Sequence, residues 1–239
     1  MKTRLGFAAA AVLAGAALVL SACATAPAAP NEGASPGDGS SATAPDVTNA
    51  LEVAWLDDGR MFAVVTWGSS TCVPVASEVT ASGQEVTVTL EDASGDIACT
   101  ADMRPRATIV GLPEGVKAVE DVQLTVVHGD LTSTTELDGD SALTGAGGQT
   151  TDYLPSAGWF DDGGIVLLTW GSSSCQPVID NVEETPGNVT VTFVTADRPC
   201  TMDMSPRATV LGVSDAVKDD ATLTLVGDNL DAVVTLIGD

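Results

Sequence analysis

The chain has 239 residues, with 9 Lys and Arg against 33 Asp and Glu, and a formal net charge of −24. A charge of that sign repels nucleic acid and anionic membrane surfaces, so we expect no nucleic-acid partner. With a single histidine and no C-x-x-C pair, the sequence lacks the ligand spacing of a zinc site, and we expect no metal and no cofactor.

The first residues are typical of an export signal. Lys2 and Arg4 precede an apolar run over residues 5–20, which is short for a membrane-spanning helix at about sixteen residues. The run ends in LSAC, and this tetrapeptide resembles the lipobox of bacterial lipoproteins. The resemblance implies that residues 1–22 are a signal peptide and that Cys23 is lipidated at its sulfur. An ordinary secretory signal, cleaved after a small residue, is the alternative.

Residues 23–47 are built from Ala, Pro, Gly and Ser and show no apolar periodicity. Such a segment cannot bury enough surface to offset its ordering entropy, so we expect a lipidated flexible linker. The predicted location is the extracytoplasmic face of the cell membrane, where the lipid makes the contact with the bilayer.

The rest of the chain contains an internal sequence repeat. WLDDGRMFAVVTWGSSTCVPV starts at Trp55, and WFDDGGIVLLTWGSSSCQPV starts at Trp159. This self-similarity predicts two domains, over residues 48–140 and 153–239. Residues 141–152 between them are rich in Gly and Thr and are predicted to be a linker.

The periodicity within each repeat is that of strands. Residues 62–65 and 165–168 are continuous apolar runs, typical of a strand buried on both faces. Residues 85–90 and 188–193 alternate apolar residues with threonine, which suits a sheet with one wet face. We therefore predict an all-β fold of two tandem small β-sandwich (Ig-like) domains, with a barrel as the other possibility.

Four cysteines remain once Cys23 is set aside, and four cysteines allow three pairings. The repeat favours Cys72–Cys99 and Cys175–Cys200, because each domain then closes its own disulfide. Disulfides of this kind persist in exported proteins.

The repeated serines raise the question of a nucleophile. Ser70 and Ser173 would each need a base, usually a histidine. The only histidine is His128, and Gly227 occupies its aligned position in the second repeat. We therefore expect no enzymatic activity.

Acidic pairs also recur, as Asp57-Asp58 and Asp161-Asp162, each followed by glycine. Calcium requires more oxygen ligands than one such pair offers. A β-turn in which Asp bonds its own backbone is the favoured interpretation.

Two further pairs are candidates for binding. Arg106 and Arg207 recur in a chain with few basic residues, and each could hold a local carboxylate, a distant one or an acidic ligand. Trp55 and Trp159 precede the acidic turns and could contact a carbohydrate or a peptide if they are partly exposed.

Taken together, W-[LF]-D-D-G, T-W-G-S-S-[ST]-C and C-T-x-D-M-x-P-R-A-T make the repeats similar to a domain of predicted secreted lipoproteins from high-GC Gram-positive bacteria. That resemblance implies a location and a fold but no activity. The hypothesis is a membrane-anchored lipoprotein that acts as a non-catalytic binding or envelope-interaction module for an unknown extracellular ligand. A hydrolase acting on cell-envelope polymers and a solute receptor of a transporter are the alternatives.

Overall fold

The computed structural model describes residues 51–93, 95, 98–195 and 197–238. The predicted signal peptide, the lipidation site Cys23 and the flexible linker lie outside the described residues. Within the described part of the chain, no helix is long and apolar enough to cross a membrane.

The described chain is all-β, as predicted, and its strands divide into two sets of seven that we call repeat 1 and repeat 2. Repeat 1 contains β1 (Glu52–Leu56), β2 (Met61–Gly68), β3 (Val75–Ser82), β4 (Glu85–Glu91), β5 (Arg104–Gly111), β6 (Val122–His128) and β7 (Leu131–Leu137). Repeat 2 contains β8 (Ser156–Asp161), β9 (Gly164–Gly171), β10 (Ile179–Thr185), β11 (Asn188–Phe193), β12 (Ser205–Gly212), β13 (Thr222–Val226) and β14 (Ala232–Ile237). A short 3-10 turn, η1 (Asp57–Gly59), joins β1 to β2.

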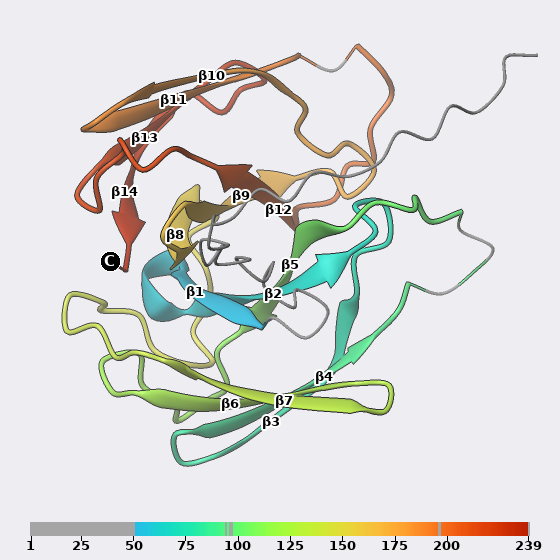
Figure 1. Ribbon diagram of the computed structural model, residues 1–239, viewed down its shortest axis with the longest axis vertical. Helices are drawn as coiled ribbons and strands as arrows, with labels where there is room; N and C mark the ends of the chain where they lie inside the picture. Colours follow the sequence, from blue (N-terminus) through green and yellow to red (C-terminus); the bar gives the residue numbers. More distant parts are fainter. Residues whose placement is uncertain (1–50, 94, 96–97, 196, 239) are drawn as a thin grey trace, which may run out of the picture. The chain divides into compact units, whose positions relative to one another are not determined.

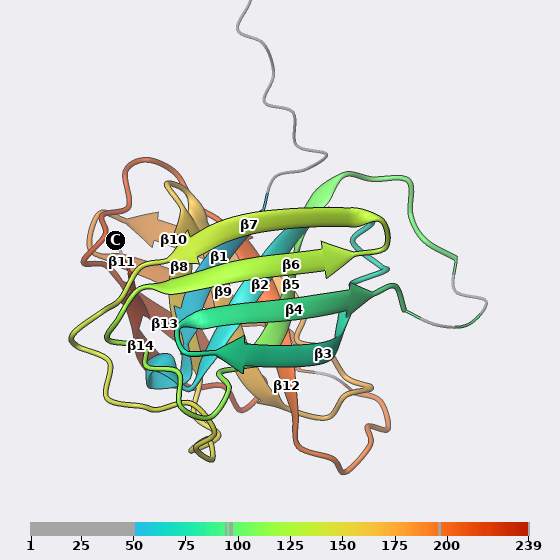
Figure 2. The ribbon, with the colours of Figure 1, turned by 90° about the horizontal axis from the view of Figure 1, so that it is seen from below.

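Both repeats sort their strands in the same way. Repeat 1 has a three-stranded sheet of order β1-β2-β5, which we call its inner sheet. The strands of repeat 2 form one seven-stranded sheet of order β10-β11-β13-β14-β8-β9-β12, and we call its β8-β9-β12 part the inner sheet of repeat 2. The outer sheet of repeat 1 has four strands in the order β3-β4-β6-β7, and Figure 2 shows it face on. The β10-β11-β13-β14 part of the seven-stranded sheet corresponds to it, and we call this part the outer sheet of repeat 2. In repeat 2 a two-residue parallel pairing of β14 with β8 joins the two sheets.

Each inner sheet packs on its own outer sheet. In repeat 1, Phe62 and Val64 of the inner sheet share a core with Val86, Val88 and Leu90 of β4. The threonines between those β4 residues point to the other face, as the alternation predicts, because successive side chains of a strand lie on opposite faces. Repeat 2 repeats this arrangement with Ile165 and Leu167 against Val189 and Val191.

The other faces of the two inner sheets pack on each other. This central core contains eight buried residues, from repeat 1 and repeat 2 alike: Ala54, Leu56, Ala63, Val65, Ala107, Phe160, Val166 and Leu168. The order of layers is therefore outer, inner, inner, outer, which Figure 1 shows from top to bottom. The continuous apolar runs of β2 and β9 are buried on both faces because each repeat covers the second face of the other.

The segment 141–152 is not a free tether. Leu143 is buried, and the Gly145 amide donates to the Asp58 carbonyl at 2.8 Å. A Cβ on Gly147 would lie 1.9 Å from the Pro113 carbonyl oxygen, so this glycine permits close backbone approach. The segment is therefore held against repeat 1 by Leu143 and by backbone contacts, which its composition does not reveal.

Candidate functional site

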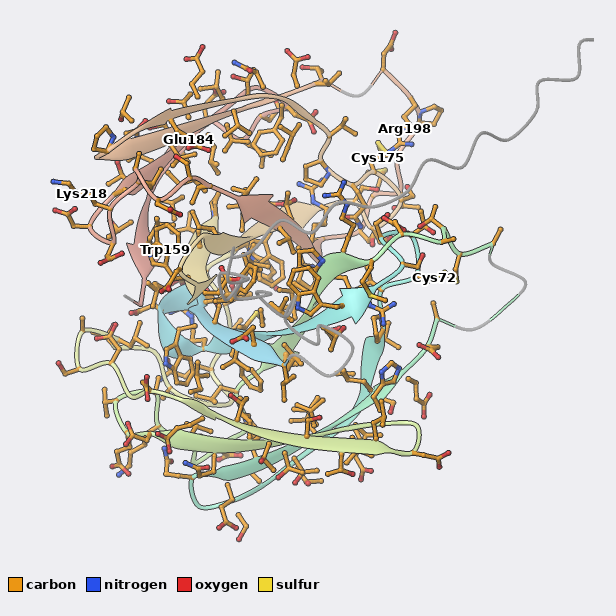
Figure 3. All side chains as sticks on the ribbon, in the orientation of Figure 1. Cys72, Trp159, Cys175, Glu184, Arg198 and Lys218 are labelled. Carbon is orange, nitrogen blue, oxygen red and sulfur yellow. A yellow bond between two sulfur atoms is a disulfide. The ribbon has the colours of Figure 1, made fainter. Side chains whose placement is uncertain are left out.

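The stretch that follows β2 and β9 is a turn held by a disulfide. Cys72 bonds to Cys99 and Cys175 bonds to Cys200, which confirms the pairing within each repeat. We call the segments around Cys72 and Cys99 the staple loops of repeat 1, and those around Cys175 and Cys200 the staple loops of repeat 2. Figure 3 shows Cys72 and Cys175 on the right and Trp159 well to the left.

Serine and threonine hydroxyls in the staple loops bond to one another and to an aspartate. In repeat 1, Ser69 Oγ lies 2.9 Å from Thr100 Oγ1, and the Ser70 amide donates to Asp102 at 3.2 Å. In repeat 2 the Ser173 amide donates to Asp203 at 3.3 Å. Among the described residues, no histidine or lysine is bonded to the serines of either loop, and these hydroxyls close the loop instead.

Hydrogen bonds to the Asp102 carboxylate change its acidity. The Thr100 hydroxyl, followed by Ser70, lowers the pKa of Asp102 from 3.8 to about 2. The corresponding hydroxyl of Thr201, helped by Ser173 and Ser205, also holds the pKa of Asp203 well below its ordinary value. Such bonds favour the charged form of a carboxyl group.

We expect Thr100→Val to raise the pKa of Asp102 toward 3.8, since the largest cause of the shift is removed. A depressed native pKa adds stability above the unfolded value, and that stability is lost as pH falls from about 3.8 toward about 2. Carboxyl-carbon NMR across this range measures the change. Thr87→Val, on the outer sheet, is the control, and an unchanged pKa of Asp102 in Thr100→Val would show that the threonine is not the cause.

The two candidate arginines belong to the staple loops. Arg207 is only 7% exposed and donates to the Cys175 carbonyl at 2.9 Å and to the Trp170 carbonyl at 3.0 Å. Arg106 donates to the Cys72 carbonyl in the same way. Burial lowers the pKa of Arg207, and the charge of Asp228 acts against this. A carboxylate partner was one of the possibilities from the sequence, whereas in the structure both arginines donate hydrogen bonds to backbone carbonyls of their own repeat.

The position of each arginine side chain explains the glycine of the repeated T-W-G motif. A Cβ on Gly68 would lie 2.6 Å from the guanidinium carbon of Arg106, and one on Gly171 would lie 2.8 Å from that of Arg207. The repeated glycine thus makes room for the repeated arginine. Neither arginine lines the cleft described below.

The two candidate tryptophans lie together at the joint between the repeats. Trp55 is 4% exposed, and its Nε1 donates to the Asp138 carbonyl at 2.7 Å. Trp159 is half-buried, and its Nε1 donates to the Asp219 carbonyl at 3.3 Å. Trp55 also packs edge-on against Phe62, so it is a core residue with one side on the cleft.

A cleft of about 420 Å³ opens between the repeats beside these tryptophans. Its walls come from β1, from the end of β7 with the segment after it, and from β8 with the turn that follows it. Asp219 and Gly238 complete the lining. Among the described residues that line it there is no Lys, Arg or His, whereas seven are carboxylates: Glu52, Glu136, Asp138, Asp140, Asp161, Asp162 and Asp219. We call it the acidic cleft. The sequence signals were the repeated D-D-G and the D-G-D after β7, but only folding brings them together.

Glu52 is affected by this crowding of negative charge. Burial, and then the charge of Asp161, raises the pKa of Glu52 above 4.5. Since the native state holds this proton more tightly than the unfolded chain, ionised Glu52 lowers stability above its native pKa, and the penalty disappears below about 4.5.

We expect Glu52→Gln to raise the melting temperature at pH 7, because it removes a half-buried charge that faces another carboxylate. The gain should shrink as pH falls toward 4.5. Thermal denaturation at a series of pH values measures it, with Glu85→Gln on the exposed face of β4 as control. A lower melting temperature at pH 7 would contradict the repulsion.

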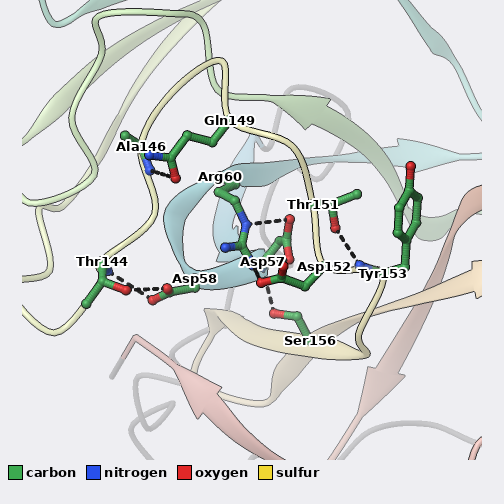
Figure 4. Close-up of polar contacts among 10 residues, drawn as sticks. All are labelled: Asp57, Asp58, Arg60, Thr144, Ala146, Gln149, Thr151, Asp152, Tyr153 and Ser156. Carbon is green, nitrogen blue, oxygen red and sulfur yellow. Dashed lines mark hydrogen bonds and ion pairs between the residues drawn. The ribbon is translucent and has the colours of Figure 1, made fainter.

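The acidic turns of the two repeats differ in their contacts. In repeat 1, Arg60 binds Asp57 at 2.9 Å and Asp152 at 3.1 Å, while Thr144 donates its hydroxyl to Asp58 at 2.6 Å (Figure 4). The hydroxyl and then the amide of Thr144 lower the pKa of Asp58, and the charge of Arg60 adds to this. The acidic turn of repeat 1 therefore takes part in the contact between repeat 1 and the connecting segment.

The turn of repeat 2 lies between two clefts. Asp161 and Asp162 line the acidic cleft and also a second cleft of about 480 Å³, to which Trp67 and Pro105 of repeat 1 contribute. Within the described residues, no group of three or more His, Cys, Asp or Glu side chains is arranged to hold a metal ion.

Comparison with known proteins gives no relative. No family model matches the chain, no curated protein is significantly similar to it, and no solved structure matches it.

Proposed function

We propose that this protein is a non-catalytic binding module held at the extracytoplasmic face of the membrane by a lipid on Cys23. The LSAC tetrapeptide after an apolar run supports the anchor. Two disulfides support an oxidising compartment, because thiols stay reduced in most cytosolic proteins. Mass spectrometry of the mature N-terminus tests the anchor: an acylated Cys23 is expected, and a free Ala24 terminus would contradict it.

We infer further that each repeat is a β-sandwich of the general Ig-like kind. An inner and an outer sheet enclose one core in each repeat, and the sheet orders are open rather than closed as in a barrel. One parallel pair in each outer sheet, β4 with β6 and β11 with β13, departs from the antiparallel immunoglobulin arrangement.

The acidic cleft is the ligand site of this proposal. The observation that carries it is a cavity between the two repeats, with a repeat-matched tryptophan from each at its wall. A cavity of about 420 Å³ falls within the usual range for small-ligand sites. Seven carboxylates, with no basic residue among the described residues of the lining, favour a positively charged ligand, and Trp159 offers an aromatic surface to a cation.

Binding can be tested on the full chain in detergent micelles with a thermal-shift series of spermidine, choline, a lysine-rich peptide, Ca²⁺ and a neutral glycan. The cationic organic ligands should raise the melting temperature, and added salt should weaken the effect. Asp161→Asn and Trp159→Ala should each reduce it.

Asp130→Asn is the matched control, because it removes one exposed carboxylate at the β6–β7 turn, outside the cleft. Equal losses in Asp130→Asn and Asp161→Asn would show general charge attraction and would overturn the cleft as the site.

A solute receptor for a transporter is a second candidate. It is favoured by the same observation, a cavity of ligand size between two halves of one body. Ligand size distinguishes the two functions. A receptor should bind spermidine or choline more tightly than the lysine-rich peptide, whereas an envelope-interaction module should bind the peptide more tightly.

A further inference from the structure

One tripeptide, Asp-Asp-Gly, adopts two backbone conformations in this chain. Asp57 and Asp58 of repeat 1 have φ values of 51° and 54°, in the left-handed region. Asp161 and Asp162 of repeat 2 do not lie in that region. Left-handed φ is uncommon for residues other than glycine, and it persists where surrounding contacts hold it. The contacts around η1 therefore select its conformation.

Those contacts come from Arg60 at the end of the same turn, from the connecting segment and from repeat 2. The Asp57 amide donates to Ser156 Oγ of β8 at 2.7 Å, and both residues are buried. Arg60 clamps the Asp57 carboxylate through two nitrogens, at 3.1 and 2.9 Å, and reaches Asp152. Figure 4 shows these side chains converging on one point. In repeat 2 the position of Arg60 is occupied by Gly164, and the clamp is missing from that turn.

The central core between the two inner sheets has the fewest buried residues of the three cores. The central core has eight buried residues, three of them alanines, against fifteen and fourteen in the cores within the repeats. Local opening starts where few apolar contacts are buried. We therefore expect local opening of this body to start between the two inner sheets.

The position of this layer matters for the clefts. Residues of both repeats line the acidic cleft, and the second cleft is also built from both. Any shift of one inner sheet against the other therefore changes the walls of both cavities.

We propose that the Asp57–Arg60 turn is a latch, whose release lets the two inner sheets move apart and so regulates access to the acidic cleft. The regulatory part rests on the proposed function of that cleft. In the closed state Asp57 takes its left-handed conformation, with its carboxylate on Arg60 and its amide on Ser156. In the released state the turn loses these contacts and relaxes toward the conformation seen in repeat 2.

Amide hydrogen exchange of the full chain, without ligand, tests the latch. Arg60→Ala should speed exchange in β1, η1 and β8 at least tenfold, while Val88 and Val191 in the outer-sheet cores stay protected. Arg104→Ala removes an equal charge at an exposed position and should change neither set. Equal acceleration of both sets in Arg60→Ala, or of neither, would overturn the latch.

Arg60→Lys is the second variant if Arg60→Ala fails to fold, and it should show the same pattern at smaller size, because one ammonium cannot replace the two-nitrogen clamp. The spermidine thermal shift, measured in the same variants, tests regulation. An unchanged shift in a variant with an open joint would overturn the regulatory part. If spermidine fails on the unaltered chain, the proposed ligand class is wrong, while the exchange data still decide the latch.

Discussion

Replacing Cys72 and Cys99 by alanine should lower the free energy of unfolding by about 3–4 kcal/mol. The bond closes a span of 27 residues, and the chain-entropy relation gives about this value for such a loop. The residues between β4 and β5 that are described form no strand, so the disulfide is the main covalent restraint on this loop. Urea denaturation of the unaltered protein and of the double alanine variant measures the difference.

The control is the equivalent change in repeat 2. Cys175 and Cys200 close a span of 25 residues, so their joint replacement should cost a similar amount. The two losses should add, because the disulfides close separate loops of separate repeats. A loss under about 1 kcal/mol would show that hydroxyl contacts such as Ser69 with Thr100 keep the loop closed alone.

Gly158→Ala should also cost much, about 2–3 kcal/mol. A Cβ on Gly158 would lie 2.2 Å from the Trp55 carbonyl oxygen and 3.3 Å from that of Ile237. These are backbone atoms of β1 and β14, so the clash is relieved only by moving strands, which places the cost high in the range for overpacking. In a chain of this size the melting temperature should fall by about 4–10 °C.

Gly111→Ala is the matched control, since Gly111 also lies in an inner sheet but has no atom within 4 Å of an added Cβ. It should be neutral or slightly stabilising, because alanine restricts the unfolded chain. Equal losses in the two variants would point to backbone conformation rather than to contact between β1 and β8.

Several features of the fold were predictable from particular residues. The alternation of Val86, Val88 and Leu90 with threonine gave both the strand and its buried face. The cysteine pairing followed from the repeat, because a duplicated unit can close its own bond. The roles of Arg106 and Arg207 were not predictable, since a backbone carbonyl that accepts a hydrogen bond has no sequence signature.

The candidate site was predictable only in part. Trp55 and Trp159 were candidates, and both line the acidic cleft. The carboxylates around them come from segments as far apart as Glu52 and Asp219, and nothing local in the sequence relates these positions. The Gly-rich segment 141–152 resembles a linker in composition. Its glycines are present because backbone atoms of other segments lie where a side chain would be, and composition does not show this.

By itself, the sequence determined the duplication, the strands and the two disulfides, because each of these follows from local periodicity or from a covalent bond within one repeat. Only the tertiary structure decided that the repeats pack inner sheet on inner sheet. Apolar residues on both faces of β2 require that something cover each face, but the hydrophobic effect has no direction and does not name the partner. The acidic cleft follows from that packing, since its two walls belong to different repeats.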